Sequence, residues 1–164
     1  MGINFGNNDF QTLPAAFHQI EHYNTTSGTL VSNSASFANV TGLTDKTITP
    51  KSSDSKILIH ICGFCYSYHG GGGSTLEGRI LRNGGQIWES VLNGRNNASH
   101  YHGAWTHIMF FDNPSTTSQT TYKFQIRETF GNTSVGWNRF DGNQGSGNNY
   151  RSDMYLIEVG DEAL

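Results

Sequence analysis

Two cysteines flanked by histidines are the residues whose spacing could support redox or metal chemistry in this chain. They stand in the segment HICGFCYSYH, which contains His60, Cys62, Cys65 and His69. A redox-active Cys-x-x-Cys pair needs its first cysteine at a helix N-terminus, where the helix dipole lowers the thiol pKa. Here the flanking KILIHI and YSYH are β-branched and aromatic, which favours a strand. We therefore predict two structural cysteines and no redox site.

Strand geometry also separates the two thiols. Residues three apart on a strand lie about 10 Å apart and point to opposite faces, whereas a disulfide spans at most about 7 Å between Cα atoms. The same alternation leaves only His60 and Cys62 on one face, so a zinc site within this segment is improbable. The predicted strand has two largely apolar faces, which places it in the middle of a sandwich or against a neighbouring subunit. One face carries Ile57, Ile59 and Ile61, and the other carries Leu58, Cys62, Phe64 and Tyr66 together with His60.

The glycine run that follows, HGGGGS, is not a phosphate-binding loop. It lacks the Gly-Lys-Ser/Thr ending, and no helical pattern follows it. Four consecutive glycines instead predict a flexible or tightly turned connection that lets the next strand reverse its direction.

A second group of histidines lies in GRNNASHYHGAWTH. Gly94, His100 and His102 resemble the Gly-x5-His-x-His start of the cupin metal motif, and His100 and His102 would share one face of a strand. The resemblance ends there, because Thr106 and His107 stand where the cupin glutamate is expected. A cupin-like metal-binding enzyme that uses His100 and His102, with His107 as an optional third ligand, remains one hypothesis. We assign no catalytic, cofactor-binding or metal-ligating residue and expect no cofactor and no enzymatic activity.

The elements that position these residues are predicted to be strands. The chain is 35% hydrophobic and only 14% charged, with 20 glycines, which is typical of a turn-rich β protein. RNGG predicts a hairpin, and TTYKFQIRETF alternates between apolar and polar residues. We predict an all-β fold, an antiparallel β-sandwich that is most economically a jelly roll of about eight strands.

The chain divides into a predicted N-terminal arm, residues 1–28, and a jelly-roll domain, residues 29–164. LPAAFHQIEHYN within the arm fits either a short helix or an extended docking segment. The net charge of −3 and the lack of a Lys/Arg cluster argue against nucleic acid as a partner. No apolar run reaches membrane-spanning length and no signal peptide is evident, so we expect no membrane partner and synthesis in a host cytoplasm.

Three pieces of the sequence resemble a family of small β domains found in virion proteins of tailed bacteriophages, especially marine ones. They are ASFANVTGLTDKTITPKSSDSKILIHI, GRILRNGGQIWES and the terminal MYLIEVG, and together they cover roughly Ser34 to Gly160. The hairpin and the long strand before it also look like the C1q and tumour-necrosis-factor jelly rolls, which assemble as trimers. The resemblance implies a trimeric, non-enzymatic module on the virion surface.

Three functional hypotheses follow. The first is a structural virion protein, either a capsid decoration or head-fibre knob or a short tail-fibre component, with the N-terminal arm contacting other virion proteins. The second is a receptor-recognition module that binds host surface glycans through aromatic and Gly/Asn-rich segments such as GWNRFDGNQGSGNNY. The same aromatic residues suit a subunit interface equally well. The third is the cupin-like enzyme.

Overall fold

The structure, a computed structural model, describes residues 17–32, 34–69, 73–95, 101–129, 133–140 and 148–160. These residues form thirteen strands and no helix, so the described chain has no helix that could span a membrane. The strands are β1 (Phe17–Thr25), β2 (Thr29–Ser32), β3 (Ala38–Asn39), β4 (Lys46–Ile48), β5 (Lys56–His69), β6 (Ser74–Arg82), β7 (Gly85–Arg95), β8 (Tyr101–Asp112), β9 (Thr120–Glu128), β10 (Thr133–Trp137), β11 (Arg139–Phe140), β12 (Asn148–Asn149) and β13 (Ser152–Val159).

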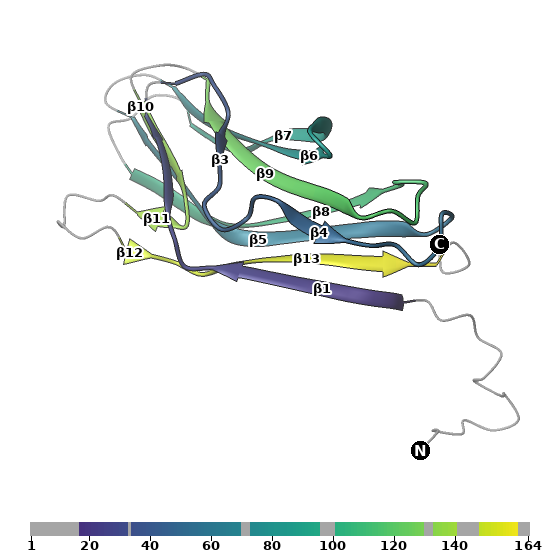
Figure 1. Ribbon diagram of the computed structural model, residues 1–164. Helices are drawn as coiled ribbons and strands as arrows, with labels where there is room; N and C mark the ends of the chain where they lie inside the picture. Colours follow the sequence, from purple (N-terminus) through teal and green to yellow (C-terminus); the bar gives the residue numbers. More distant parts are fainter. Residues whose placement is uncertain are drawn as a thin grey trace, which may run out of the picture.

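The strands form two large antiparallel sheets that pack face to face (Figure 1). Sheet A has six strands, in the order β1-β13-β5-β10-β2 with β8 on the other side of β5. Sheet B has five strands, in the order β3-β9-β6-β7 with β4 also paired to β9. The predicted antiparallel β-sandwich is confirmed. The two sheets hold more strands than the eight or so expected, because β1 and the five-residue β10 were not predicted as strands.

The core lies between the two sheets and follows the alternation of their long strands. On β9, Tyr122, Phe124 and Ile126 are fully buried, while the alternate residues face outward, as the sequence predicts. On β5 the inward residues are Ile57, Ile59, Ile61 and Cys65. Branched and aromatic side chains therefore fill the space between the sheets, and burial of this apolar area is the main force that holds them together.

The β6–β7 hairpin confirms the prediction from RNGG. Arg82 pairs with Gly85, which leaves Asn83 and Gly84 as a two-residue turn. Both turn residues have positive φ angles, 49° for Asn83 and 87° for Gly84. A type I′ turn requires this geometry, and Asn-Gly is the dipeptide that adopts it most readily.

The strand β5 is the centre of sheet A, and its neighbour changes partway along its length. Its first half pairs with β13, from Lys56 to Cys62, and its second half pairs with β10, from Cys65 to His69. Gly63 lies at the change. A Cβ atom built on Gly63 would stand 2.5 Å from the indole of Trp137, which is fully buried. The glycine between the two cysteines therefore makes room for a core tryptophan.

The glycine run after β5 connects the two sheets. β5 belongs to sheet A and β6 to sheet B, so the connection predicted from the glycines passes from one sheet to the other. Gly70 to Gly72 lie outside the described residues.

The segment predicted as an N-terminal arm contributes a strand. Phe17–Thr25 forms β1 and pairs antiparallel with β13 along its length, so the helical alternative is wrong for residues 17–24. The spacing of Phe17, Ile20 and Tyr23 is compatible with a helix, but pairing with β13 satisfies the backbone and tertiary contacts override local periodicity. Residues 1–16 lie outside the described residues.

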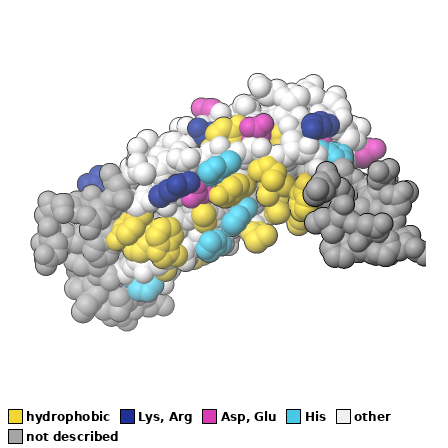
Figure 2. Space-filling view, turned by 90° about the horizontal axis from the view of Figure 1, so that it is seen from below, with side chains coloured by type: hydrophobic (Ala, Val, Ile, Leu, Met, Phe, Trp, Pro, Cys, Tyr) yellow, Lys and Arg dark blue, Asp and Glu magenta, His cyan; other side chains and the backbone are white. Residues whose placement is uncertain are grey.

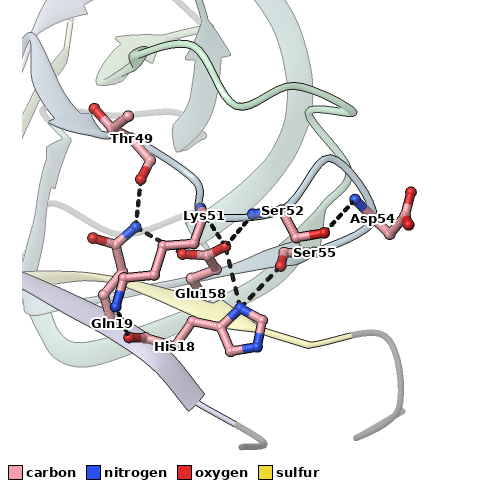
Figure 3. Close-up of polar contacts among 8 residues, drawn as sticks. All are labelled: His18, Gln19, Thr49, Lys51, Ser52, Asp54, Ser55 and Glu158. Carbon is pink, nitrogen blue, oxygen red and sulfur yellow. Dashed lines mark hydrogen bonds and ion pairs between the residues drawn. The ribbon is translucent and has the colours of Figure 1, made fainter.

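A buried carboxylate fixes β1 and the loop before β5 to sheet A (Figure 3). Glu158 is fully buried and accepts hydrogen bonds from the Lys51 backbone N–H at 2.7 Å and from the Gln19 side-chain amide at 2.7 Å. Lys51 Nζ donates to the backbone carbonyl of His18 at 2.6 Å. Burial raises the pKa of Glu158, but hydrogen bonds from Ser55, Gln19, Lys51 and Ser52 outweigh it and hold the pKa below its usual value. The carboxylate stays ionised and joins three segments of the chain.

Candidate functional site

The two outer faces of the sandwich differ in chemistry. The outer face of sheet B is charged: Arg127 binds Glu77 at 2.7 Å and Glu89 at 2.9 Å. The guanidinium groups of Arg79 and Arg127 lie over the ring of Phe37, 4.0 and 4.4 Å from its centroid. These groups satisfy one another, which is typical of a surface that remains in solvent.

The outer face of sheet A is apolar. Five large hydrophobic side chains at its β1 and β8 edges are exposed: Phe17 (62%), Ile20 (58%), Trp105 (58%), Met109 (66%) and Phe111 (46%). Figure 2 views the molecule from the side of β1 and β13 and shows hydrophobic side chains gathered there with histidines among them. Scattered apolar residues are normal on a surface, but a contiguous apolar area marks an interaction site. We call this outer surface of β1, β13, β5 and β8 the apolar face.

The register of the four strands builds the apolar face in rows. Directly opposed residues on neighbouring strands share a face, so each row can be followed through the pairings of β1 with β13, β13 with β5, and β5 with β8. One row is entirely apolar. The successive rows are Ile20–Ile157–Leu58–Phe111, His22–Tyr155–His60–Met109 and Asn24–Asp153–Cys62–His107, followed on β5 and β8 by Phe64–Trp105.

Stacked rings run across the middle of the apolar face. His22 stacks on Tyr155 with ring centroids 4.4 Å apart, and Tyr155 lies 5.8 Å from His60. His60 in turn stacks on His107 at 5.6 Å. Burial and the neighbouring His107 lower the pKa of His60, so its imidazole is neutral at pH 7. The central ring of this ladder therefore adds no charge to the apolar face.

The ladder ends at an ion pair on the β1 side. His22 Nε2 lies 2.7 Å from Asp153, and Arg151 also contacts this carboxylate at 2.7 Å. Burial raises the pKa of Asp153, but the hydrogen bonds and charges of Arg151 and His22 lower it overall. Asp153 is the acidic residue in the rows described above, and its carboxylate is bound by His22 and Arg151.

An aromatic cluster closes the other end of the apolar face. The ring of Phe64 lies 4.3 Å from Tyr150 and packs edge-on against Trp105 at 5.9 Å. Gly103 on β8 lies under Phe64, so a side chain at Gly103 would collide with this ring. The glycine lets the aromatic cluster lie flat against the sheet while Trp105 remains exposed.

The two cysteines lie as strand alternation predicts. Cys65 is fully buried on the inner side of β5, and Cys62 is half-buried on the apolar face; both are free thiols. Burial raises the pKa of Cys65 to about 12, although a hydrogen bond with Thr106 opposes this shift. Cys65 is therefore a packing residue. Leu58 and Phe64 are half-buried on the same side of β5 as Cys62. Tyr66, further along the same side, is buried, so this side of β5 is less exposed to solvent towards the C-terminal end of the strand.

The structure does not bring the candidate cupin histidines together within the described part of the chain. His102 and His107 are five residues apart on β8 and so lie on opposite faces. His102 Nδ1 lies 3.1 Å from Asn93 Oδ1, whereas His107 belongs to the ladder. His100 lies outside the described residues, as do residues 141–147 of the Gly/Asn-rich segment. Among the described side chains, no group of three or more His, Cys, Asp or Glu could hold a metal ion.

Sequence reasoning identified only the β5 part of the apolar face, because the other members come from three further strands. Two signals were present: THIMFF on β8 and DMYLIEV on β13 place apolar residues at both alternating positions. A strand that is apolar on both sides must cover something on each side. The sequence did not show that HQIEHYN forms a strand. As part of β1, this segment brings Ile20 and His22 to the same surface.

Comparisons with known proteins give a weak structural likeness to a viral chain. No protein-family model matches the chain, and no curated protein matches it. A solved structure titled "Structure of infectious bursal disease virus Gx strain" aligns with 96% of this chain at 13% identity and a TM-score of 0.40. The alignment covers 43% of that viral chain, so the present chain spans less than half of its length. The functional argument therefore rests on the residues of this chain.

Proposed function

We propose that this protein is a non-enzymatic structural module of a tailed-bacteriophage virion surface, and that it forms a homotrimer through the apolar face. The observation that carries this proposal is the contrast between the two outer faces. Five large hydrophobic side chains, each 46–66% exposed, lie on the outer side of sheet A. The outer side of sheet B carries internally paired charges. Covering the apolar face with another copy removes this hydrophobic area from water.

The size of the apolar face fits a subunit contact. Four strands spaced about 4.8 Å apart give a width of about 19 Å, and Lys56 to Phe64 on β5 extends about 27 Å. The flat footprint is on the order of 500 Å², and the relief of the side chains raises the accessible area towards the roughly 800 Å² per partner of a standard interface. Aromatic residues and methionine, which are enriched in interface cores, supply much of it.

The trimeric state and the virion setting come from the family resemblance, and the resembling pieces map onto coherent elements. The first piece spans β3, β4 and the first half of β5, the second is the β6–β7 hairpin, and the third is most of β13. β5 and β13 are also the two central strands of the apolar face. We further propose that residues 1–16, which precede the edge strand β1, contact other virion proteins.

A pair of matched variants tests the contact surface. Met109 on the apolar face is 66% exposed, and Val91 on the outer face of sheet B is 57% exposed. Met109→Lys should convert the trimer to a monomer in light scattering at micromolar concentration, because it places a charge within the contact. Val91→Lys should leave the mass of the trimer unchanged, and circular dichroism should show both variants folded.

The proposal fails if wild-type protein is monomeric, or if both lysine variants have the same mass as a trimeric wild type. In the first case the assembly is wrong, and in the second the surface is wrong.

The glycan-binding hypothesis has one specific observation in its favour, the exposed ring of Trp105 beside Tyr150. Aromatic faces of this kind stack on sugar rings. A glycan array with wild type and Trp105→Ala separates the two uses. Glycan binding that Trp105→Ala abolishes would support receptor recognition, whereas no binding to any glycan would leave Trp105 as an interface residue.

A further inference from the structure

Two histidine rings on neighbouring strands of the apolar face share a hydrogen bond that depends on their protonation. His60 Nε2 on β5 and His107 Nδ1 on β8 lie 3.3 Å apart. Whichever nitrogen donates, the other must accept with a free lone pair, so at least one of the two rings is neutral. Protonation of both rings turns both nitrogens into donors, and the hydrogen bond is lost.

The hydrogen-bonded pair lies inside the proposed contact and not at its border. Along β8, Phe111 precedes the pair by one row on one side and Trp105 follows it by one row on the other. Met109, which opposes His60, is 66% exposed and lies between Phe111 and His107 on this face. A second copy that covers Phe111 and Trp105 therefore covers both imidazoles as well.

The surroundings of the pair offer no spare negative charge among the described residues. The ionisable side chains that face His60 from its own and the adjacent strands are Cys62 on β5, Tyr155 and Asp153 on β13, and His107 on β8. Asp153 is the acidic group of this set, and it already binds His22 and Arg151. A proton added to the pair therefore leaves a positive charge that no free carboxylate balances.

Covering the pair sets assembly against proton binding. Burial and the neighbouring His107 already lower the pKa of His60 in the single chain, and a second copy removes more water from the ring and lowers this pKa further. Below the pKa of the free chain, separate chains bind protons that the assembled chains exclude. By linkage, the stability of the assembly is present near neutral pH and is lost as the pH falls below the ordinary histidine value of about 6.5.

We propose that the His60–His107 pair makes assembly of the trimer depend on pH, so that the chains associate near neutral pH and separate in mildly acidic solution. The inference rests on the proposed trimer and adds a regulation of its contact surface. A proton on His22 has a different effect, because the carboxylate of Asp153 lies 2.7 Å from this ring and balances its charge.

The carboxylates that hold this part of the fold do not titrate in the same range. Glu158 and Asp153 both have pKa values below their ordinary ones, so both stay ionised down to about pH 5. A loss of assembly between about pH 8 and about pH 5 therefore reports on histidine and not on these acids.

Light scattering coupled to size exclusion, run from about pH 8 to about pH 5 at several micromolar concentrations, tests the proposal. Wild type should have the mass of three chains at the upper limit and approach the mass of one chain at the lower limit. The chain concentration needed for half-assembly should rise at least about tenfold, because a pKa difference of one unit between free and assembled chains changes affinity tenfold per chain.

Variants locate the effect. Glutamine places its amide near the position of Nε2 and asparagine near that of Nδ1, so His60→Gln with His107→Asn keeps a hydrogen bond and removes the titration. This double variant should remain trimeric over the whole pH range. His102→Asn is the matched control, because His102 lies on the opposite side of β8 and contacts Asn93; it should separate over the same pH range as wild type.

The outcomes distinguish this proposal from the trimer itself. A wild type that is monomeric even at the upper pH limit overturns the trimer, and the pH dependence with it. A wild type that keeps the mass of three chains at both limits overturns only the pH dependence. Separation of the double variant over the same pH range as wild type overturns the assignment to this pair.

The single variants His60→Gln and His107→Asn keep the test decisive where the double variant does not assemble. Each retains one ring that can titrate, and each should separate at a lower pH than wild type. An unchanged pH of separation in both single variants also overturns the assignment. Circular dichroism at both pH limits excludes acid unfolding as the cause of a lower mass.

Discussion

At the scale of single residues, Gly63 shows that the Cys-x-x-Cys segment serves the packing of the core. The Cys-Gly-Phe-Cys sequence reads as a redox or metal motif, yet its glycine accommodates the indole of Trp137. The indole N–H donates to Ser152 Oγ at 3.1 Å, and Asn138 donates to the same oxygen at 2.6 Å. The ring is therefore fixed by polar contacts as well as by burial and cannot easily move away from an added side chain.

Gly63→Ala should destabilise the protein by about 1–3 kcal/mol, the usual cost of overpacking a well-packed core. Urea denaturation monitored by fluorescence measures this loss. Gly85→Ala is the matched control, because the nearest atom to a Cβ built there is 3.6 Å away, and it should change stability by less than about 0.5 kcal/mol. Equal stability of the two variants would show that the ring of Trp137 does not restrict this position.

The two thiols should differ in reactivity. Cys65 is fully buried with its pKa raised to about 12, whereas Cys62 is half-buried on the apolar face. Because the thiolate is the reactive form, Cys62→Ser should show no reaction with a thiol reagent until the protein unfolds. Titration with Ellman's reagent, with and without denaturant, measures this. Rapid reaction of native Cys62→Ser would mean that Cys65 is accessible.

Sequence reasoning predicted these cysteines correctly because strand alternation is a local property. It could not explain Gly63, since Trp137 stands far along the chain and meets β5 only through the pairing of β10. It also could not identify the ladder of rings that joins His60 and His107 to His22 and Tyr155. That ladder depends on the register of four strands, and register is set by the whole sheet.

At the scale of elements, β1 is one of the strands that the sequence did not predict. Its edge position brings Ile20 and His22 to the apolar face, and its other side is held by Glu158 and Lys51 (Figure 3). Long strands with clean alternation, such as β9, were predictable, and so was the Asn-Gly hairpin. β1 was not, because its apolar spacing fits a helix as well as an irregular strand with a bulge after Phe17.

Glu158→Gln should destabilise the protein by about 2 kcal/mol, because the amide that replaces one carboxylate oxygen cannot accept the buried N–H donors. Urea denaturation gives the loss, and hydrogen exchange should show lower protection of the β1 amides. Glu89→Gln is the control: Glu89 pairs with Arg127 at the surface, and its loss should cost less than about 1 kcal/mol. Unchanged protection of β1 in Glu158→Gln would contradict this role of the carboxylate.

The same carboxylate should make stability depend on pH in acid. The folded-state pKa of Glu158 lies below its ordinary value of 4.5, so between these two values the unfolded state binds more protons than the folded state. Its stabilisation is present above pH 4.5 and is lost as pH falls through the folded-state pKa. The stability difference between wild type and Glu158→Gln should therefore shrink from about pH 7 to about pH 3 in urea denaturation. A difference that stays constant over this range would contradict the assignment.

At the scale of the whole molecule, the sandwich has one face suited to solvent and one suited to contact. Composition and alternation established the fold class, and low charge was visible in the sequence. The sorting of apolar residues to sheet A and of paired charges to sheet B was not visible, because the assignment of strands to sheets is nonlocal. This difference between the two outer faces is the basis of the proposed assembly.

The mass of the wild-type protein in solution tests the central claim most directly. Light scattering coupled to size exclusion at about pH 8 should give three times the 18.1 kDa chain mass, about 54 kDa, across the micromolar range. A mass of one chain over that whole range would contradict the account, because the apolar face would then remain exposed to water without a second copy to cover it.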